Sequence, residues 1–227
     1  MLIRVLHSAP RREAAQDARL SPSERARVAR AAPAERDAVA AALLLARLAI
    51  AESYGVDPGA VRVRRRCPRC GSADHGVPLA ERTDGGPVPH LSLSRTTGLV
   101  AVALAEHGPV GVDVERADRV DLGRVALAPG ERPAPGPHGL LRTWTRKEAV
   151  LKAAGTGLAV DPALLRVADA AGAPGVTTTA AALAPPAGTR WWLTDLALEH
   201  GFLAALATTI PPAAAPAVEV LRVTLPA

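Results

Sequence analysis

The sequence predicts an α+β protein built as two similar lobes, a pseudo-dimer in which each lobe packs a helix on a mainly antiparallel sheet. Three observations support this prediction: one long apolar helix in each half, short strand-like runs after each helix, and Gly- or Pro-containing turns between those runs. We place residues 1–106 in an N-terminal lobe and residues 107–227 in a C-terminal lobe. No repeat visible in the sequence itself marks the two lobes as copies.

The N-terminal half is expected to begin with helices. Ser21-Pro22, followed by Glu24, is typical of a helix start, because it combines a capping hydroxyl, proline at the first position and an acid in the first turn. The apolar segment from Ala34 to Tyr54 predicts a long helix that ends at Gly55. Alternating polarity predicts strands at residues 61–65 and 90–94, and an apolar run predicts a buried strand at residues 98–105. Residues 67–90 are rich in Gly, Pro and Asp and are expected to form loops.

The C-terminal half repeats this order with a shorter helix. A buried strand is expected at residues 110–114, and the helix from Leu140 to Ala154 ends at Gly155. Residues 191–198 and 202–209 flank His200-Gly201 and predict a hairpin. Strand pattern also predicts a last strand at residues 218–225, whereas residues 129–139 and the Pro/Ala/Thr-rich connector after the helix are expected to be irregular.

Composition narrows the class of partner. A net charge of +5 and a pI near 10.2 favour an acidic partner or a phosphorylated ligand. Aromatic residues make up 2% of the chain, which leaves no platform for stacking bases and argues against binding of single-stranded nucleic acid. We expect no nucleic-acid partner. The longest apolar run, Ala38 to Ala51, is interrupted by Arg47 and is too short to span a membrane. We therefore expect a cytoplasmic protein with no membrane partner, and the two cysteines exclude a disulfide framework.

Two groups of charged residues have a spacing that suggests chemistry. Asp113 and Glu115 lie two apart in a predicted strand and therefore leave the same face. Trp144, Glu148 and Lys152 are spaced by four on the later helix and share one of its faces. Carboxylates so close repel one another unless a cation lies between them, and oxygen-only ligands suit Mg²⁺ together with phosphate. The competing interpretation is a solvated strand edge and an ordinary helical ion pair.

The use of lysine favours the chemical interpretation. Lys147 and Lys152 are the only lysines, so the other 25 of the 27 basic residues (27 − 2) are arginines. Lysine and arginine are not interchangeable where a compact ammonium is needed. Both lysines lie in the segment that carries Glu148.

These segments resemble the motifs of a known family. Residues 110–115, Val-Gly-Val-Asp-Val-Glu, and residues 144–155, Trp-Thr-Arg-Lys-Glu-Ala-Val-Leu-Lys-Ala-Ala-Gly, are similar to the two signature motifs of the 4′-phosphopantetheinyl transferases. Residues 90–104 resemble that family's coenzyme A motif with its following strand, and residues 191–207 resemble its C-terminal hairpin. The length is similar to that of the larger, monomeric branch, typified by the surfactin-synthetase activator, whose two similar lobes form a pseudo-dimer.

The resemblance implies a function. Such enzymes transfer the 4′-phosphopantetheine arm of coenzyme A to a serine of an acidic, helical acyl or peptidyl carrier protein, with Mg²⁺, and release adenosine 3′,5′-bisphosphate. The larger branch serves polyketide or non-ribosomal peptide synthesis. By this resemblance Asp113, Glu115 and Glu148 bind the metal, Glu148 is the base, Lys152 stabilises the phosphate in transit, and residues 1–106 are the coenzyme A-binding half. The residues expected to contact coenzyme A are Arg36, Arg47, Arg66, Ser92, Ser94, Arg95, Lys147 and Lys152.

Other features of the sequence leave alternatives. Leu93 stands where the family often has a phosphate-binding histidine, and Val77 stands where its preceding loop often has a basic residue. These departures motivate a non-catalytic member that binds coenzyme A or a carrier protein. Cys67, Cys70 and His75, beside three consecutive arginines, instead suggest a small zinc-dependent nucleic-acid module, which would need a fourth ligand such as Asp74 or His90.

Overall fold

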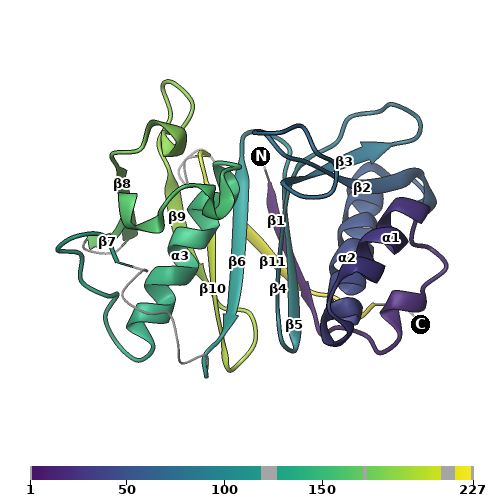
Figure 1. The fold of residues 1–227 in the computed structure, drawn as a ribbon, viewed down its shortest axis with the longest axis horizontal. Coiled ribbons are helices and arrows are strands. Elements are labelled where there is room, and N and C mark those ends of the chain that lie inside the picture. Colours follow the sequence, from purple (N-terminus) through teal and green to yellow (C-terminus); the bar gives the residue numbers. More distant parts are fainter. Residues whose placement is uncertain (1, 119–126, 171–172, 211–217, 226–227) are drawn as a thin grey trace.

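The computed structural model describes residues 2–118, 127–170, 173–210 and 218–225. This part of the chain is a mixed α/β fold with few helices and several antiparallel sheets (Figure 1). Helices α1 (Pro22–Arg30) and α2 (Arg36–Tyr54) cover one face of a first sheet. A second sheet packs on the other face, and helix α3 (Gly139–Ala153) covers the outer side of that second sheet (Figure 1).

The first sheet has the strand order β11-β1-β5-β4. Its strands are β1 (Ile3–Ser8), β4 (His90–Thr96), β5 (Leu99–Ala105) and β11 (Val218–Arg222). Strand β1 was not expected from the sequence, because it stands near the chain start with no turn signal before it. Strand β11 pairs in parallel with β1, whereas the other neighbours are antiparallel. The last strand, which we had placed in residues 107–227, therefore lies in the sheet of the N-terminal half.

The second sheet has the order β6-β10-β9, and two hairpins stand apart from both sheets. The sheet strands are β6 (Val110–Arg116), β9 (Trp192–Leu196) and β10 (Phe202–Thr208), and the hairpins are β2–β3 (Val61–Arg66, Val77–Arg82) and β7–β8 (Leu165–Ala170, Ala173–Thr178). The pairing of β9 with β10 confirms the predicted C-terminal hairpin. The expectation of loops at β3, β7 and β8 was wrong, because these short two-stranded ribbons lack an apolar run that would reveal them.

Alternation along β6 directs two kinds of side chain to opposite sides. Val110, Val112 and Val114 are buried between the two sheets. The intervening residues therefore face helix α3, and Asp113 contacts a side chain of that helix. The pattern that makes β6 a buried strand thus also directs its carboxylates toward α3.

Gly111 sets how closely α3 approaches β6. A Cβ atom built on Gly111 would lie 2.0 Å from the carbonyl oxygen of Ala149 and 2.5 Å from the backbone nitrogen of Ala153. Only glycine fits at such a distance. This close packing brings the helix face of Glu148 and Lys152 to the strand that carries Asp113.

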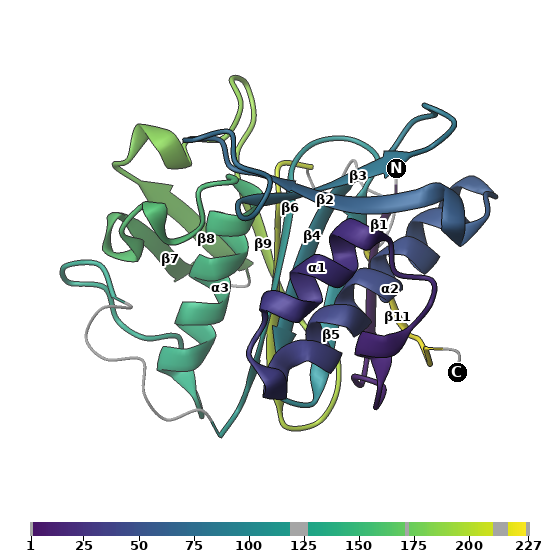
Figure 2. The same cartoon turned by 45° about the vertical axis from the view of Figure 1, so that its right-hand side comes forward.

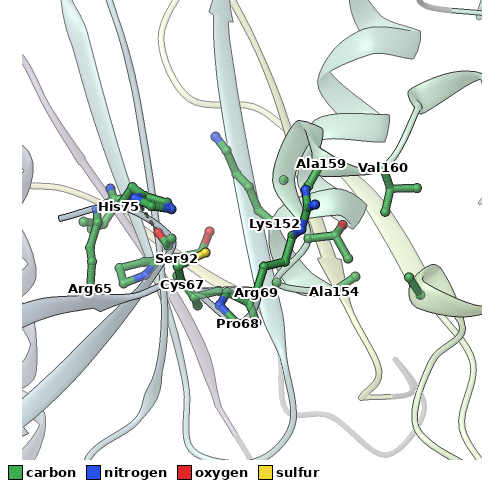
Figure 3. Close-up of a pocket in the computed structure, with 18 of the residues that line it drawn as sticks. Arg65, Cys67, Pro68, Arg69, His75, Ser92, Lys152, Ala154, Ala159 and Val160 are labelled. Atoms are coloured by element: carbon green, nitrogen blue, oxygen red, sulfur yellow. Dashed lines mark hydrogen bonds between the residues drawn. The ribbon is translucent and has the colours of Figure 1, made fainter. Parts of the chain in front are cut away.

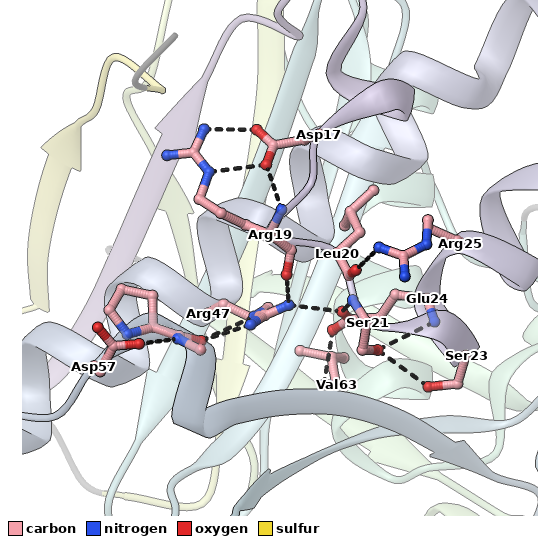
Figure 4. A network of polar contacts seen from close by, with 12 residues as sticks. Asp17, Arg19, Leu20, Ser21, Ser23, Glu24, Arg25, Arg47, Asp57 and Val63 are labelled. Carbon is pink, nitrogen blue, oxygen red and sulfur yellow. Dashed lines mark hydrogen bonds and ion pairs between the residues drawn. The ribbon is translucent and has the colours of Figure 1, made fainter.

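A buried ion pair anchors α2 to its surroundings (Figure 4). Arg47 forms an ion pair with Glu24 at 2.9 Å and donates to the carbonyl oxygen of Pro58 at 2.7 Å. Glu24 in turn accepts hydrogen bonds from the backbone N–H groups of Ser21 at 2.7 Å and Val63 at 3.0 Å. The bond from Ser21 completes the capping box of α1, which confirms the helix start predicted there.

A second network, around α3, has the same arrangement of contacts as the one around α2. Lys147 forms an ion pair with Glu131 at 2.5 Å and donates to the carbonyl oxygen of Pro162 at 3.2 Å. Glu131 accepts hydrogen bonds from the backbone N–H groups of Ala128 at 2.8 Å and Val167 at 2.7 Å. In both networks one N–H donor precedes the glutamate by three residues, and the other follows the proline by five.

The matching contacts reveal a short repeat that the sequence analysis missed. Residues 57–63 read Asp-Pro-Gly-Ala-Val-Arg-Val, and residues 161–167 read Asp-Pro-Ala-Leu-Leu-Arg-Val. In each segment the aspartate accepts a hydrogen bond from the backbone N–H two residues later. Four of the seven positions are identical. Gly55 precedes the first segment closely, whereas Gly155 lies further before the second, so aligning the two halves on these glycines does not reveal the repeat.

The part of the chain that the structure describes contains no helix long and apolar enough to cross a membrane.

Candidate active site

Asp113, Ser94 and Lys152 form a compact polar cluster between β4, β6 and α3. The ammonium of Lys152 lies 2.6 Å from Asp113 Oδ1 and 2.9 Å from Ser94 Oγ. Ser94 Oγ donates to Asp113 Oδ1 at 2.9 Å and accepts from the backbone N–H of Val114 at 3.1 Å. The other oxygen of Asp113, Oδ2, is buried and has no hydrogen-bond partner among the described residues.

The two serines of β4 connect the two sheets. Ser92 Oγ accepts a hydrogen bond from the backbone N–H of Val112 at 3.0 Å, as Ser94 does from that of Val114. Both serines are buried, and both point from β4 toward β6. Because buried backbone N–H groups need a partner, these hydroxyls replace the ladder hydrogen bonds that β6 lacks on this side. They also fix the position of Asp113 relative to the first sheet.

A cavity of about 800 Å³ adjoins this cluster, and Figure 3 shows it between the β2–β3 hairpin and α3. Figure 2 shows how that hairpin extends across the molecule toward α3. Ser92, Glu148 and Lys152 line the cavity. The other lining residues come from the hairpin loop, from β4 and from the segment after α3: Arg65, Cys67, Pro68, Arg69, His75, Gly76, Val77, Pro78, Leu91, Leu93, Ala154, Gly155, Thr156, Gly157, Ala159, Val160 and Ala182. The volume and the largely apolar walls are typical of a small-molecule site.

Three arginines, Arg27, Arg65 and Arg95, lie near Leu93, which also lines the large cavity. Burial and the nearby charges of Arg27 and Arg95 lower the pKa of Arg65 to about 10. The pKa of Arg27 is also lowered, first by burial and then by Arg95. Arg95 forms an ion pair with Glu35 at 3.4 Å, where both side chains are exposed. Like charges that crowd together in this way favour the binding of an anion between them.

The three predicted metal ligands have different surroundings in the structure. Asp113 belongs to the polar cluster and Glu148 lines the cavity, whereas Glu115 lines a second hollow of about 690 Å³ together with Arg95. The carboxylate oxygens of the three acids do not all lie within 4.8 Å of one another. Lys152, predicted to stand beside them, contacts Asp113 directly.

Several predicted coenzyme A contacts lie away from the cavity. Arg47 is enclosed in the pair with Glu24. Lys147 is fully buried against Glu131, and its burial lowers its pKa. Arg66 is exposed at the end of β2. Arg36 is exposed on α2 and donates to backbone carbonyls of the preceding segment.

Sequence reasoning considered the run of arginines at residues 64–66 and preferred Arg66, whereas the structure places Arg65 and Arg27 beside Leu93. Arg27 was not considered. Strand alternation was the signal that could have found Arg65, because Val61 and Val63 are buried and the next inward position is residue 65. The structure shows Arg65 half-buried with its guanidinium donating to the carbonyl oxygen of Gly76 at 2.7 Å. No comparable signal marks Arg27, because its position depends on how α1 packs on α2.

One family model matches part of the chain. Residues 109–207 match the model of the 4′-phosphopantetheinyl transferase superfamily. This segment covers 99 of the 227 residues (207 − 109 + 1) and begins just before β6 and ends within β10. No curated protein matches the chain. The part of the chain that carries Asp113, Glu148 and Lys152 is therefore similar to the 4′-phosphopantetheinyl transferase superfamily.

Proposed function

We propose that the protein transfers the 4′-phosphopantetheine arm of coenzyme A to a serine of a carrier protein, with Mg²⁺, and releases adenosine 3′,5′-bisphosphate. The observation that carries this proposal is the cluster of Asp113, Ser94 and Lys152, which adjoins a cavity of about 800 Å³ lined by Glu148. The match of residues 109–207 to the family model supports the same activity.

The two halves of the fold supply an internal comparison. Asp113 pairs with Ala205, the fourth residue of β10, and Leu6 pairs with Val102, the fourth residue of β5. Both side chains face the helix of their own half. The N-terminal half thus places leucine where the C-terminal half places a carboxylate.

The same comparison extends to the other two acids. Glu115 pairs with the second residue of β10 and Ser8 with the second residue of β5. Glu148 follows Lys147 in the α3 network, and Leu48 follows Arg47 in the α2 network. Because the fold accommodates Leu6, Ser8 and Leu48, it does not itself require the acids, and a role in chemistry explains them better. We also propose on these grounds that the chain is a pseudo-dimer of two similar lobes.

The donor set fits a magnesium ion. Asp113, Glu115 and Glu148 offer oxygen ligands alone, which Mg²⁺ prefers, and Asp113 Oδ2 is a buried acceptor that has no hydrogen-bond partner among the described residues. Since the three carboxylates do not share a common 4.8 Å, Glu115 and Glu148 have to shift toward Asp113 to bind one ion. When bound, such an ion would neutralise negative charge on the pyrophosphate of coenzyme A.

The side chains along α3 then have distinct roles. Glu148 takes the proton of the carrier serine, because a neutral hydroxyl is a weak nucleophile and needs a positioned base. Lys152 stabilises the charge that develops on the phosphate in transit, and its contacts with Asp113 and Ser94 hold the ammonium at the edge of the cavity. Lys147 anchors α3 through Glu131 and does not contact substrate.

We propose that coenzyme A binds in the cavity, although two basic residues that the family often uses there are replaced. Leu93 and Val77 line it and bind no phosphate. We propose that Arg27, Arg65 and Arg95 take over this role and bind the 3′-phosphate, because their charges converge beside Leu93. Residues 1–106 are accordingly the coenzyme A-binding half.

The partner is proposed to be an acidic, helical acyl or peptidyl carrier protein. A net charge of +5 favours its approach by electrostatic steering. By similarity to the larger branch, the enzyme acts as a monomer in the cytoplasm and serves polyketide or non-ribosomal peptide synthesis.

Incubation with coenzyme A, Mg²⁺ and an apo carrier protein tests the proposal. Mass spectrometry should show that the carrier gains the mass of the arm, and that Glu148→Gln and Lys152→Met abolish this gain. Glu106→Gln is the matched control, since Glu106 is exposed at the end of β5 and lies outside the site. If several carriers remain unmodified while calorimetry shows that coenzyme A binds, the protein is instead a non-catalytic binding member of the family.

A further inference from the structure

The loop of the β2–β3 hairpin gathers three soft ligand atoms. Arg66 and Val77 form the last pair of the hairpin, so residues 67–76 make its closing loop. Within this loop the sulfur atoms of Cys67 and Cys70 and a ring nitrogen of His75 all lie within 4.8 Å of one another. Cys70 Sγ lies 3.5 Å from His75 Nε2.

The loop backbone is shaped to hold these atoms together. Cys67 donates its N–H to the carbonyl oxygen of Ser72 at 2.8 Å, and its own carbonyl oxygen accepts from the N–H of Gly71 at 2.9 Å. Gly71 has φ 72°, a left-handed conformation that glycine adopts without strain. Such a turn directs both sulfurs to the same side.

Gly76 closes the loop behind the histidine. It has φ 100°, and a Cβ atom there would lie 2.3 Å from the carbonyl oxygen of Arg66. Only glycine allows the returning strand to lie this close to the outgoing one. The ring of His75 is therefore brought back beside the two cysteines that precede it by eight and five residues.

We propose that Cys67, Cys70 and His75 bind a zinc ion. Two thiolates and one imidazole are ligands that zinc prefers, and three protein ligands leave its fourth position open. On binding, the two thiols give up their protons to solvent and each sulfur forms one bond to the metal. The two residues that the sequence suggested as a fourth ligand, Asp74 and His90, do not join this group. Asp74 forms an ion pair with Arg30 at 3.2 Å instead.

The position of the site couples it to the cavity. Cys67, His75 and the intervening Arg69 line the cavity of about 800 Å³, and Figure 3 shows them on the wall that faces α3. Arg65 donates to the carbonyl oxygen of Gly76 at the end of the same loop. A metal that holds the loop would therefore also fix one wall of the cavity.

Metal titration of the full chain, freed of metal by a chelator and kept reduced, tests the site. We expect one zinc ion per chain by elemental analysis, and Co²⁺ in its place should give the charge-transfer and d–d absorption of a tetrahedral thiolate site. Cys70→Ser and His75→Gln should weaken binding by more than the roughly 10- to 100-fold that loss of an outer-shell partner costs. Asp74→Asn is the matched control in the same loop and should bind as tightly as the wild type.

The outcomes separate this site from folding and from transfer activity. Cys70 is exposed, so Cys70→Ser should unfold at the same temperature as the metal-free wild type. Glu148→Gln should keep full zinc binding, because the proposal does not depend on turnover. Equal cobalt spectra for the wild type and the Cys67→Ser/Cys70→Ser double variant would overturn the proposal, as would a loss of binding in Asp74→Asn equal to that in His75→Gln.

Discussion

Replacing Gly111 with alanine tests whether the approach of α3 to β6 creates the candidate active site. The new Cβ would lie 2.0 Å from the carbonyl oxygen of Ala149, and real Cβ atoms essentially never come closer than 3.0 Å to such an atom. The helix must therefore withdraw by about 1 Å (3.0 − 2.0), because backbone atoms on both sides cannot rotate away. Glu148 and Lys152 move with it.

Two effects of this displacement can be measured separately. Overpacking of this kind costs about 1–3 kcal/mol, which urea denaturation followed by circular dichroism will show as a lower free energy of unfolding. A shift of about 1 Å in positioned catalytic groups costs roughly a hundredfold in rate, which the carrier-loading assay will show on the folded fraction. Gly175→Ala is the matched control in another strand, because nothing lies within 4 Å of a Cβ atom at Gly175.

The result that would refute this reasoning is specific. If Gly111→Ala loads the carrier at the wild-type rate while its stability falls, the helix position does not control the site. If neither quantity changes, the close contact itself is wrong.

Three further predictions concern stability. Glu131→Gln leaves the charge of Lys147 buried without its partner, so the free energy of unfolding in urea should fall by about 3–5 kcal/mol, and adding Lys147→Met should recover part of the loss. The pKa of Asp17 is lowered from 3.8 to about 2, chiefly by the side-chain hydrogen bond from Arg19. The stabilisation that this shift represents is present above pH 3.8 and is lost as the pH falls through about 2. In Asp17→Asn the melting temperature should therefore depend less on pH between those two values than it does in the wild type. Leu151 is fully buried, so Leu151→Ala should cost about 2–5 kcal/mol, and a loss below 1 kcal/mol would contradict its place in the core.

The long elements of the fold could be predicted from the sequence because each has a continuous apolar pattern and a defined end. Helix α2 ends at Tyr54, just before Gly55, and α3 ends at Ala153, two residues before Gly155. Both glycines have left-handed backbone conformations. Strand β2 was predicted at residues 61–65, but strands β1 and β3 and the β7–β8 hairpin were not. Strand β1 owes its pairing to residues far along the chain, and the other three are short strands without an apolar run. The parallel pairing of Ile3 with Val218 has no local signature at all.

The candidate site could be predicted in part for a similar reason. Glu148 and Lys152 were expected on one helix face, and both line the cavity. The contact of Lys152 with Ser94 depends on the packing of β4 beside β6, which spacing along the chain does not reveal. Lys147 shows the limit most clearly: its partner Glu131 lies in a Pro/Gly-rich segment that was expected to be irregular, so its burial was invisible in the sequence.

The pairing of β11 with β1 joins two segments that are far apart in the sequence into one sheet. Ile3 pairs with Val218, which lies 215 positions later in the sequence (218 − 3), so this side of β1 has no partner strand until β11 has been made. Contacts so distant in sequence are slow to form, since a large loop must close first. During synthesis strand β1 therefore exposes an unpaired edge until the ribosome has released Val218 and the rest of β11. Cutting the polypeptide between its halves should yield fragments that associate with each other rather than two autonomous proteins.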